Sequence, residues 1–487
     1  MRFPVETLTL LMLTGAMEAQ APDTLWTETF GGSLEEHCYD CVLTSDGGFA
    51  MVGFTSSAGA GEDDVWLVRT DSSGNMLWQQ TYGGTSDDRG YSLAQTSDGG
   101  FILGGWTFSF GAGMADIWLI KTDGNGNLEW DREFGTTSGF ERCYPVIQTS
   151  DGSYVIAGET DNNGTTYSDI WLLKTDGDGD ILWDSTFGGA RDDFGLDVIE
   201  MDSGDYAVAG WTCYVNGTCD LKLFTTDQNG VLVDESLIGG AGTDQCRALT
   251  QLPDGDLMVV GETNSTASGL FDAWLVRADQ ECNLVWENTY GSDGQDDFGN
   301  DICILSDGNV AVCGLTKPSG GINEDLWLFL TDTAGSQQWH TTFGGSGSET
   351  GEAIVETDDG GVAVAGCTGS FGAGSTDFWL LRTEGFQSVG QQQASSGCLQ
   401  VLSAAPNPFT CSCRVTVGCA EAVDAEVFSI DGRLVRELQS APVAPGTWEI
   451  RWDGTALGGD PVPPGVYILR MVTDGGAASV KLYRMLM

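Results

Sequence analysis

Seven acidic side chains recur at nearly constant intervals along the 487-residue chain, and their spacing is the first pattern that suggests chemistry. Each lies ten residues before a turn of the Ser-Asp-Gly-Gly type or a variant of it. A ring of like charges would be relieved by a divalent cation such as Ca²⁺, so the set is a candidate metal site. The alternative, which the symmetry favours, is that each carboxylate caps its own loop through backbone amides. The seven residues are Glu36, Asp88, Glu141, Asp193, Asp244, Asp297 and Glu349.

Other residue types that commonly carry catalysis are scarce or poorly placed. The chain has two histidines, His37 and His340, and neither lies near a Gly-x-Ser-x-Gly sequence that would position a nucleophilic serine. Paired carboxylates such as Asp192-Asp193 occur in several loops, but nothing in the sequence places two of them at the separation used in glycoside hydrolysis. We therefore assign no catalytic and no cofactor-binding residues from the sequence.

The charge of the chain disfavours two classes of partner. With 71 acidic and 20 basic residues the formal net charge is −51, which opposes binding to nucleic acid and to anionic membrane surfaces. Hydrophobic residues make up 41% of the chain, enough for a buried core. After the N-terminal segment, no apolar stretch reaches the ~18 residues that would predict a transmembrane segment.

An internal repeat predicts the elements that position the seven carboxylates. Each repeat has four β-strand segments joined by turns of the Asp-Gly type, the pattern of a propeller blade. Residues 25–32 resemble the fourth strand of the other units and are expected to complete the last blade, which lacks one. Residues 22–388 are thus predicted to form an all-β, seven-bladed propeller. The seven turns align at Asp46, Asp98, Asp151, Ser203, Asp254, Asp307 and Asp359, which places the units 51 to 53 residues apart.

Residues kept in every unit separate the scaffold from any functional site. A Gly in the second strand, a Thr two residues later and an Asp at the start of the third strand occur in all seven units. A single active site on a pseudo-symmetric ring should break the symmetry, so these residues are interpreted as structural. The fourth unit departs most, with Lys222 and Val233 at positions interpreted as equivalent to Trp in other units.

The N-terminal residues have the layout of a secretory signal peptide. A basic residue precedes an apolar run, and Ala19-Gln20-Ala21 forms a small-x-small cleavage site, so residues 1–21 are expected to direct export. An exported chain with 14 cysteines can form disulfides. Cys213 and Cys219 bracket one short loop and are the best candidate pair.

A second all-β domain is predicted after a linker. Residues 389–400 are mostly small and polar, as in flexible linkers. Residues 401–487 alternate as about seven short strands in some 90 residues, which is typical of a small immunoglobulin-like β-sandwich. Nearly all of the net negative charge precedes this region, which supports two separate modules.

The C-terminal region resembles the sorting domain of the type IX secretion system, which is similar to the immunoglobulin-like domain of flagellar hook-capping proteins. The resemblance rests on five motifs in order: Pro406-Asn407-Pro408-Phe409, Phe428 to Arg436, Trp452-Asp453-Gly454, Pro464-Gly465-Val466-Tyr467 and Lys481. It departs from the family at Cys411, Cys413 and Cys419, which are unusual there. The resemblance implies passage through the periplasm, contact with the type IX secretion machinery, and release or attachment at the outer-membrane surface. Repeat arrays like the one described above often precede such tags.

These observations favour a non-catalytic binding or adhesion module for a glycan, a protein or a surface. The alternatives are a secreted hydrolase or lyase on a propeller scaffold, and a purely structural surface-layer protein. An enzyme should place several polar residues unique to single units around one pocket, whereas a structural scaffold should not.

Overall fold

The computed structural model describes residues 21–161, 167–265, 270–291, 294–317, 323–385, 400–405, 413–418, 423–429, 433–444, 447–457, 462–463, 465–473 and 476–484. The chain divides into two compact units, Met1–Ser388 and Val389–Met487. The predicted signal peptide and linker lie almost wholly outside the described residues, so their bounds stay predictions. The described residues contain no helix that is long and apolar enough to cross a membrane.

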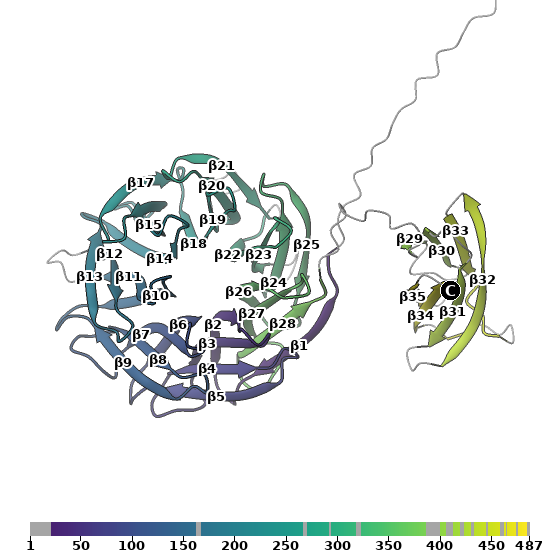
Figure 1. Ribbon diagram of the computed structural model, residues 1–487, viewed down its shortest axis with the longest axis horizontal. Helices are drawn as coiled ribbons and strands as arrows, with labels where there is room; N and C mark the ends of the chain where they lie inside the picture. The colour runs from purple at the N-terminus through teal and green to yellow at the C-terminus, as the bar shows by residue number, and fades with distance from the viewer. Residues whose placement is uncertain are drawn as a thin grey trace, which may run out of the picture. The chain divides into compact units, whose positions relative to one another are not determined.

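The described part of the first unit is a ring of seven four-stranded antiparallel sheets, one for each sequence repeat (Figure 1). The first four blades comprise β2 (Glu36–Leu43), β3 (Phe49–Thr55), β4 (Asp64–Thr70) and β5 (Met76–Tyr82); β6 (Asp88–Gln95), β7 (Phe101–Thr107), β8 (Asp116–Thr122) and β9 (Leu128–Phe134); β10 (Glu141–Gln148), β11 (Tyr154–Thr160), β12 (Asp169–Thr175) and β13 (Ile181–Phe187); and β14 (Asp192–Glu200), β15 (Tyr206–Cys213), β16 (Cys219–Thr226) and β17 (Leu232–Ile238). The last three comprise β18 (Asp244–Gln251), β19 (Leu257–Thr263), β20 (Asp272–Ala278) and β21 (Leu284–Tyr290); β22 (Asp297–Ile304), β23 (Val310–Thr316), β24 (Asp325–Thr331) and β25 (Gln337–Phe343); and β26 (Glu349–Glu356), β27 (Val362–Thr368), β28 (Asp377–Thr383) and β1 (Thr24–Phe30). The first strand of each blade faces the centre of the ring and the fourth strand forms the rim (Figure 1). The predicted seven-bladed propeller is confirmed.

The N-terminal strand closes the ring, as the repeat alignment predicted. β1 pairs antiparallel with β28, with Phe30 opposite Phe378 and Trp26 opposite Arg382. Phe30 is buried in a core cluster that also holds Phe378 and Trp66 of the first blade. This pairing completes the last sheet and joins the two ends of the propeller, so β28 has no free edge.

Burial along the strands explains why the middle strands are so apolar. All residues of β3 and β7 are buried, because the blades pack face to face and cover both sides of each middle strand. One interblade cluster joins Val52 and Leu67 of the first blade to Leu103 and Trp118 of the second. The outer strand β5 instead contains only exposed and half-buried residues.

The Asp at the start of the third strand of each blade packs against a Gly that follows the fourth strand, as Asp64 illustrates. Its Oδ2 accepts hydrogen bonds from the amides of Ala60 (2.9 Å) and Gly61 (3.2 Å). Its buried Oδ1 has no hydrogen-bond partner and faces Gly83, where an added Cβ would lie 1.9 Å from that oxygen. The oxygen therefore lies against the glycine Cα–H, which agrees with a structural role for the repeated Asp.

A second repeated contact joins neighbouring blades at the rim. The Trp of a fourth strand covers the turn glycine of the next blade; an added Cβ at Gly230 would lie 2.5 Å from Trp183. In the fourth blade, strand pairing places Asp234 at this Trp position, because Asp234 pairs with Thr225 as Trp183 pairs with Lys174. The assignment of Val233 to the Trp position was therefore wrong by one residue, since both units have the same turn length before the strand.

The C-terminal unit is a single curled antiparallel sheet of seven strands in its described part. In spatial order these are β29 (Gln400–Ala405), β30 (Cys413–Gly418), β33 (Thr447–Trp452), β32 (Leu434–Ala444), β31 (Asp424–Ser429), β34 (Gly465–Thr473) and β35 (Gly476–Arg484). The long strand β32 pairs with β31 through its first half and with β33 through its second half, which lets the sheet fold over. Its core includes Val417, Val427, Ile450, Trp452 and Leu469. The predicted small all-β module is present in this form.

Candidate ligand-binding site in the propeller channel

The seven candidate metal ligands lie at the start of the inner strands and are all buried. In the last blade, Glu349 accepts hydrogen bonds from the Gly345 amide (2.7 Å) and the Thr368 hydroxyl (3.0 Å). Glu36 accepts the same two kinds of bond from Gly32 and Thr55. This geometry matches the loop-capping alternative. Among the described residues, no group of three or more His, Cys, Asp or Glu is placed to hold a metal ion, and the Ca²⁺ ring stays a prediction.

The fourth blade again differs from the others at this position. Its carboxylate Asp193 lies 3.3 Å from the ammonium group of Lys222, which also lies 3.1 Å from Glu235. Lys222 stands where other blades have a core Trp, so one of the seven negative charges has a cationic partner within the protein.

The inner strands carry a second set of equivalent positions, three residues after each acidic residue, and here the symmetry is broken. We call these seven half-buried or exposed residues the channel ring. They are Tyr39, Tyr91, Tyr144, Leu196, Arg247, Asn300 and Glu352, and all of them line one cavity of about 280 Å³ on the inner side of the blades.

Three consecutive members of the channel ring form an aromatic platform. Tyr39 and Tyr91 stack with ring centroids 4.3 Å apart, and Tyr91 meets Tyr144 edge to face at 5.7 Å. His37 extends the platform, with its ring 4.6 Å from that of Tyr39. Contacts of this kind order the three tyrosine rings, which line the cavity together.

The other side of the channel ring is polar and held by its own hydrogen bonds. Arg247 donates to both carboxylate oxygens of Glu262, at 2.8 and 3.1 Å, in a bidentate pair. Asn300 donates to the Gly351 carbonyl (2.9 Å) and to Glu352 (3.3 Å). The cavity therefore presents oriented polar groups opposite an aromatic surface.

Three half-buried carboxyl groups in the cavity wall join neighbouring blades. Asp197 accepts hydrogen bonds from the Val198 and Leu249 amides, and Asp40 likewise bridges Cys41 and Leu93. Burial raises the pKa of Asp197 to about 7 and that of Asp40 to about 6, although these hydrogen bonds oppose the shift. Asp301 makes the same bridge between the sixth and seventh blades. In all three groups both oxygens are engaged by backbone N–H groups, which favours an interblade link over proton transfer.

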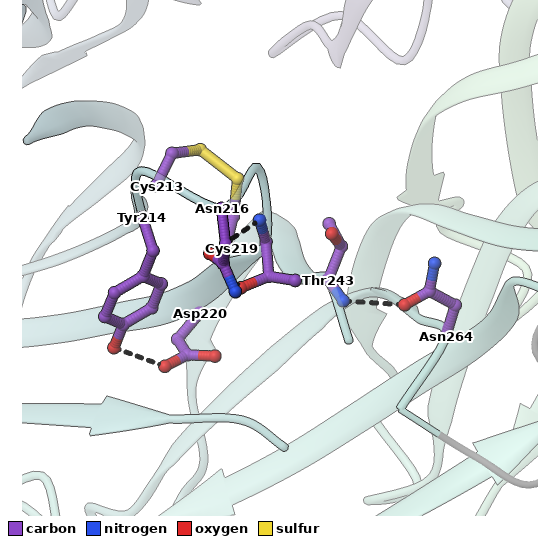
Figure 2. The surroundings of a disulfide bond; sticks show 8 residues. Cys213, Tyr214, Asn216, Cys219, Asp220, Thr243 and Asn264 are labelled. Carbon is purple, nitrogen blue, oxygen red and sulfur yellow. Dashed lines mark hydrogen bonds between the residues drawn. A yellow bond between two sulfur atoms is a disulfide. The ribbon is translucent and has the colours of Figure 1, made fainter. Parts of the chain in front are cut away.

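The predicted disulfide is present at the tip of the fourth blade. Cys213 and Cys219 are bonded, and the adjacent Tyr214 hydroxyl donates to Asp220 at 2.6 Å (Figure 2). Asp220 is the repeated Asp of this blade, so the tyrosine replaces one of the loop amides that serve Asp64. The disulfide loop is thus a local replacement for the longer loop of other blades.

The sequence contained the signal for the channel ring, but the repeat comparison did not extract it. Aligning the units on their turns places the three tyrosines and the four other residues in one column. The structure adds that the inner strands bring these seven residues to one cavity.

The fold defines a seven-bladed β-propeller protein with a cavity lined by the inner strands of its ring. No protein-family profile matches the chain. The chain is 24% identical over 433 residues to the regulatory protein FlaEY of Caulobacter vibrioides, covering 76% of this chain. It spans only 42% of the length of that curated relative.

Solved structures that resemble the chain do so at low sequence identity. A puromycin hydrolase structure has a TM-score of 0.50 and is 13% identical, with 79% of this chain and 59% of that chain covered. PorZ, described as an essential surface component of the type IX secretion system of Porphyromonas gingivalis, has a TM-score of 0.43 and is 13% identical, with 94% and 60% covered. These likenesses concern the fold alone.

Proposed function

We propose that the propeller is a non-catalytic glycan-binding module that reaches the cell surface or the medium through its C-terminal unit. The observation that carries the binding role is the broken symmetry of the channel ring. Scaffold positions repeat in every blade, whereas this ring combines three adjacent tyrosines with Arg247, Asn300 and Glu352 around one cavity.

The chemistry of the cavity suits a sugar. Tyr39, Tyr91 and Tyr144 offer aromatic surface and hydroxyl groups to a sugar, while Arg247 offers N–H donors and Asn300 its amide oxygen to sugar hydroxyl groups. The volume of about 280 Å³ fits a short saccharide segment rather than a large cofactor. Because the chain carries a net charge of −51, a neutral or amino sugar is favoured over a polyanionic glycan.

A glycan array probed with the full chain tests this role. Replacing Tyr91 by Ala removes the central ring of the platform and should weaken binding of any hit at least tenfold. Tyr214→Ala is the matched control, because Tyr214 lies on the disulfide loop and does not line the cavity. Equal affinity of wild type and the Tyr91 variant would reject the channel site.

The export route rests on the sequence resemblance of the C-terminal region. Trp452 and Tyr467, which belong to two of its motifs, lie in the core of this unit with ring centroids 4.9 Å apart. Removing residues 398–487 should leave the propeller folded but retained in the periplasm of a host that has type IX secretion. Normal surface display of the shortened protein would reject the assignment.

The hydrolase alternative has two observations in its favour. Polar residues unique to single blades line one cavity, and burial raises the pKa of Asp40 and Asp197 in its wall, which is typical of general acids. The engagement of their oxygens by backbone amides argues against it. Incubating an array hit with the full chain and analysing the products by mass spectrometry distinguishes the two, since a binding module returns the glycan intact.

A further inference from the structure

The fourth blade buries a primary amine between two carboxyl groups. Lys222 Nζ lies 3.3 Å from Asp193 Oδ1 and 3.1 Å from Glu235 Oε1, and both Lys222 and Asp193 are more than nine-tenths buried. The three residues belong to three strands of one sheet, β14, β16 and β17. An amine and a carboxyl group that touch in a protein interior are the two reactants of an amide bond.

Sequence differences of this blade create the contact. In other blades a core Trp stands at the position of Lys222, and its indole N–H donates to the residue thirteen positions later, as Trp118 does to Asp131 at 3.1 Å. Glu235 stands at the equivalent position of the fourth blade and contacts Lys222 in the same way. The lysine side chain is slimmer than an indole, so its nitrogen reaches Asp193 as well.

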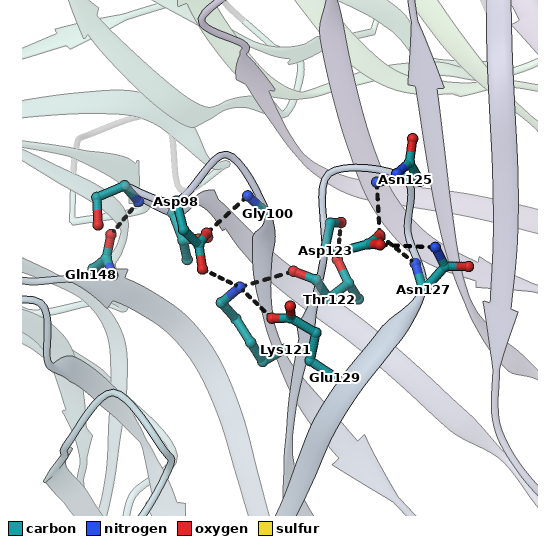
Figure 3. Close-up of polar contacts among 11 residues, drawn as sticks. Asp98, Gly100, Lys121, Thr122, Asp123, Asn125, Asn127, Glu129 and Gln148 are labelled. Atoms are coloured by element: carbon teal, nitrogen blue, oxygen red, sulfur yellow. Dashed lines mark hydrogen bonds and ion pairs between the residues drawn. The ribbon is translucent and has the colours of Figure 1, made fainter.

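A similar group in the second blade shows which feature sets the fourth blade apart. Lys121 Nζ lies 3.0 Å from both Asp98 and Glu129 (Figure 3), and the Lys121 side chain is also buried. The Asp98 side chain, however, is 59% exposed, whereas the Asp193 side chain is 4% exposed. Water solvates the Asp98 carboxylate and keeps it ionised, and an ionised carboxylate resists attack by an amine.

The pKa values of these two carboxyl groups shift in opposite directions. Although burial opposes the shift, hydrogen bonds from neighbouring groups lower the pKa of Asp98 to about 2. Burial raises the pKa of Asp193, although Lys222 and Thr212 oppose the shift. The neutral acid, which is the form that an amine attacks, is therefore more readily formed at Asp193 than at Asp98.

We propose that Lys222 and Asp193 condense to an intramolecular amide bond, with Glu235 as the proton acceptor. Lys222 first passes one proton to Asp193, which gives a neutral amine and a neutral carboxylic acid. Nζ then forms a bond to Cγ of Asp193, and Glu235 accepts a proton from the nitrogen. The bond between Cγ and the hydroxyl oxygen breaks, and the hydroxyl leaves with that proton as one water molecule, so Glu235 is regenerated.

The surroundings favour this product. Condensation removes two opposite charges from the interior, where their desolvation is costly. The folded blade holds the reacting groups in contact, which replaces the encounter of two free molecules. The amide bond gives this blade a second covalent link, besides the Cys213–Cys219 disulfide, and it does not depend on the proposed glycan site.

Mass spectrometry of the full chain, reduced and denatured, tests the bond directly. We expect residues 192–247, which Arg191 and Arg247 bound, to form one tryptic peptide that is lighter than its sequence by one water molecule, because the blocked Lys222 is not cut. Fragmentation should give no products from within residues 193–222, since the bond closes a ring there. Lys121 and Lys174 are internal controls in the same digest and should be cut, because their Asp partners are exposed. Cleavage at Lys222 with an unmodified mass overturns the proposal.

Three variants assign the roles. Lys222→Met removes the nucleophile, and Glu235→Gln removes the proton acceptor while the Lys–Asp pair remains. Both should have the full sequence mass in this segment and a lower melting temperature than wild type. Lys174→Met is the matched control and should leave the water loss in place. A water loss that persists in either of the first two variants overturns the proposal.

Discussion

Cys282 lies across the interface between the fourth and fifth blades from Asp234, where other blades pair a turn glycine with a tryptophan. Cys282 is fully buried and is the described non-glycine residue with a positive φ, 61°. At the equivalent position Gly230 has no room for a Cβ, because Trp183 covers it. The loss of the Trp in one blade is thus matched by a side chain in place of Gly in the next.

Coupling between these two positions gives the first prediction. Asp234→Trp alone should destabilise the protein by about 1–3 kcal/mol, because the indole would meet the Cys282 side chain. Adding Cys282→Gly restores the pair of the other blades and should recover stability. Urea unfolding of both single variants and the double variant should give a coupling energy of about 0.5–3 kcal/mol. Additive effects would mean that the two positions are independent.

Two neighbouring glycines test the close packing of the repeated Asp against a glycine. A Cβ at Gly188 would lie 1.9 Å from Asp169 Oδ1, whereas a Cβ at Gly189 would meet nothing within 4 Å. Gly188→Ala should therefore cost about 1–3 kcal/mol through overpacking, and Gly189→Ala should be nearly neutral. Thermal unfolding of the two variants compares the same chemical change at adjacent residues. Equal melting temperatures of the two variants would contradict this packing role of the repeated Asp.

Ring closure predicts unequal effects for two apolar residues of β1. Phe30→Ala should destabilise the propeller by about 3–5 kcal/mol, since the ring of Phe30 is buried in the core between the last and first blades. Leu25→Ala should change little, because Leu25 is 48% exposed. Deleting residues 22–32 should be more damaging than either change, because it exposes the edge of β28. Circular dichroism melts compare the three, and a deletion that melts like wild type would refute closure by β1.

The half-buried interblade carboxyl group of Asp197 should make stability depend on pH. Burial raises its pKa to about 7, while an unfolded Asp titrates near 3.9. Between about pH 4 and 7 the folded protein holds a proton that the unfolded chain has released, so this group's contribution to stability falls as pH rises through that window. Carboxyl NMR should find Asp197 titrating near neutrality, with Asp71, whose pKa is lowered by hydrogen bonds from Asn75, as the control. A value below 5 for Asp197 would contradict this.

Calcium distinguishes the two interpretations of the seven acidic residues. If they cap loops, Glu349→Gln should cost about 1–3 kcal/mol by leaving a Gly345 or Thr368 donor poorly matched, and millimolar Ca²⁺ should leave the melting temperature unchanged. If they form a cation ring, Ca²⁺ should raise the melting temperature of wild type, and changing three of the seven residues should abolish the rise. We expect the first result.

The sequence by itself determined the architecture, because each blade is specified by local signals. Turns such as Ser45-Asp46-Gly47 need a glycine at positive φ, and the apolar runs between the turns fit strands buried on both faces. Repetition of these signals set the number of blades. The overhanging strand at residues 25–32 was enough to predict closure, since an incomplete last sheet leaves an edge that only this segment can fill.

Only the tertiary structure decided where the broken symmetry matters. Tyr91 and Glu352 are far apart in the chain, and only ring closure carries them into one cavity. The cavity beside Thr225 lies between two blades, with Asp234 of the fourth and Glu281 of the fifth in its wall, and no single repeat encodes it. One residue of strand register separates Val233 from Asp234, and hydrogen-bonded pairing sets that register because side chains alternate between the faces of a sheet.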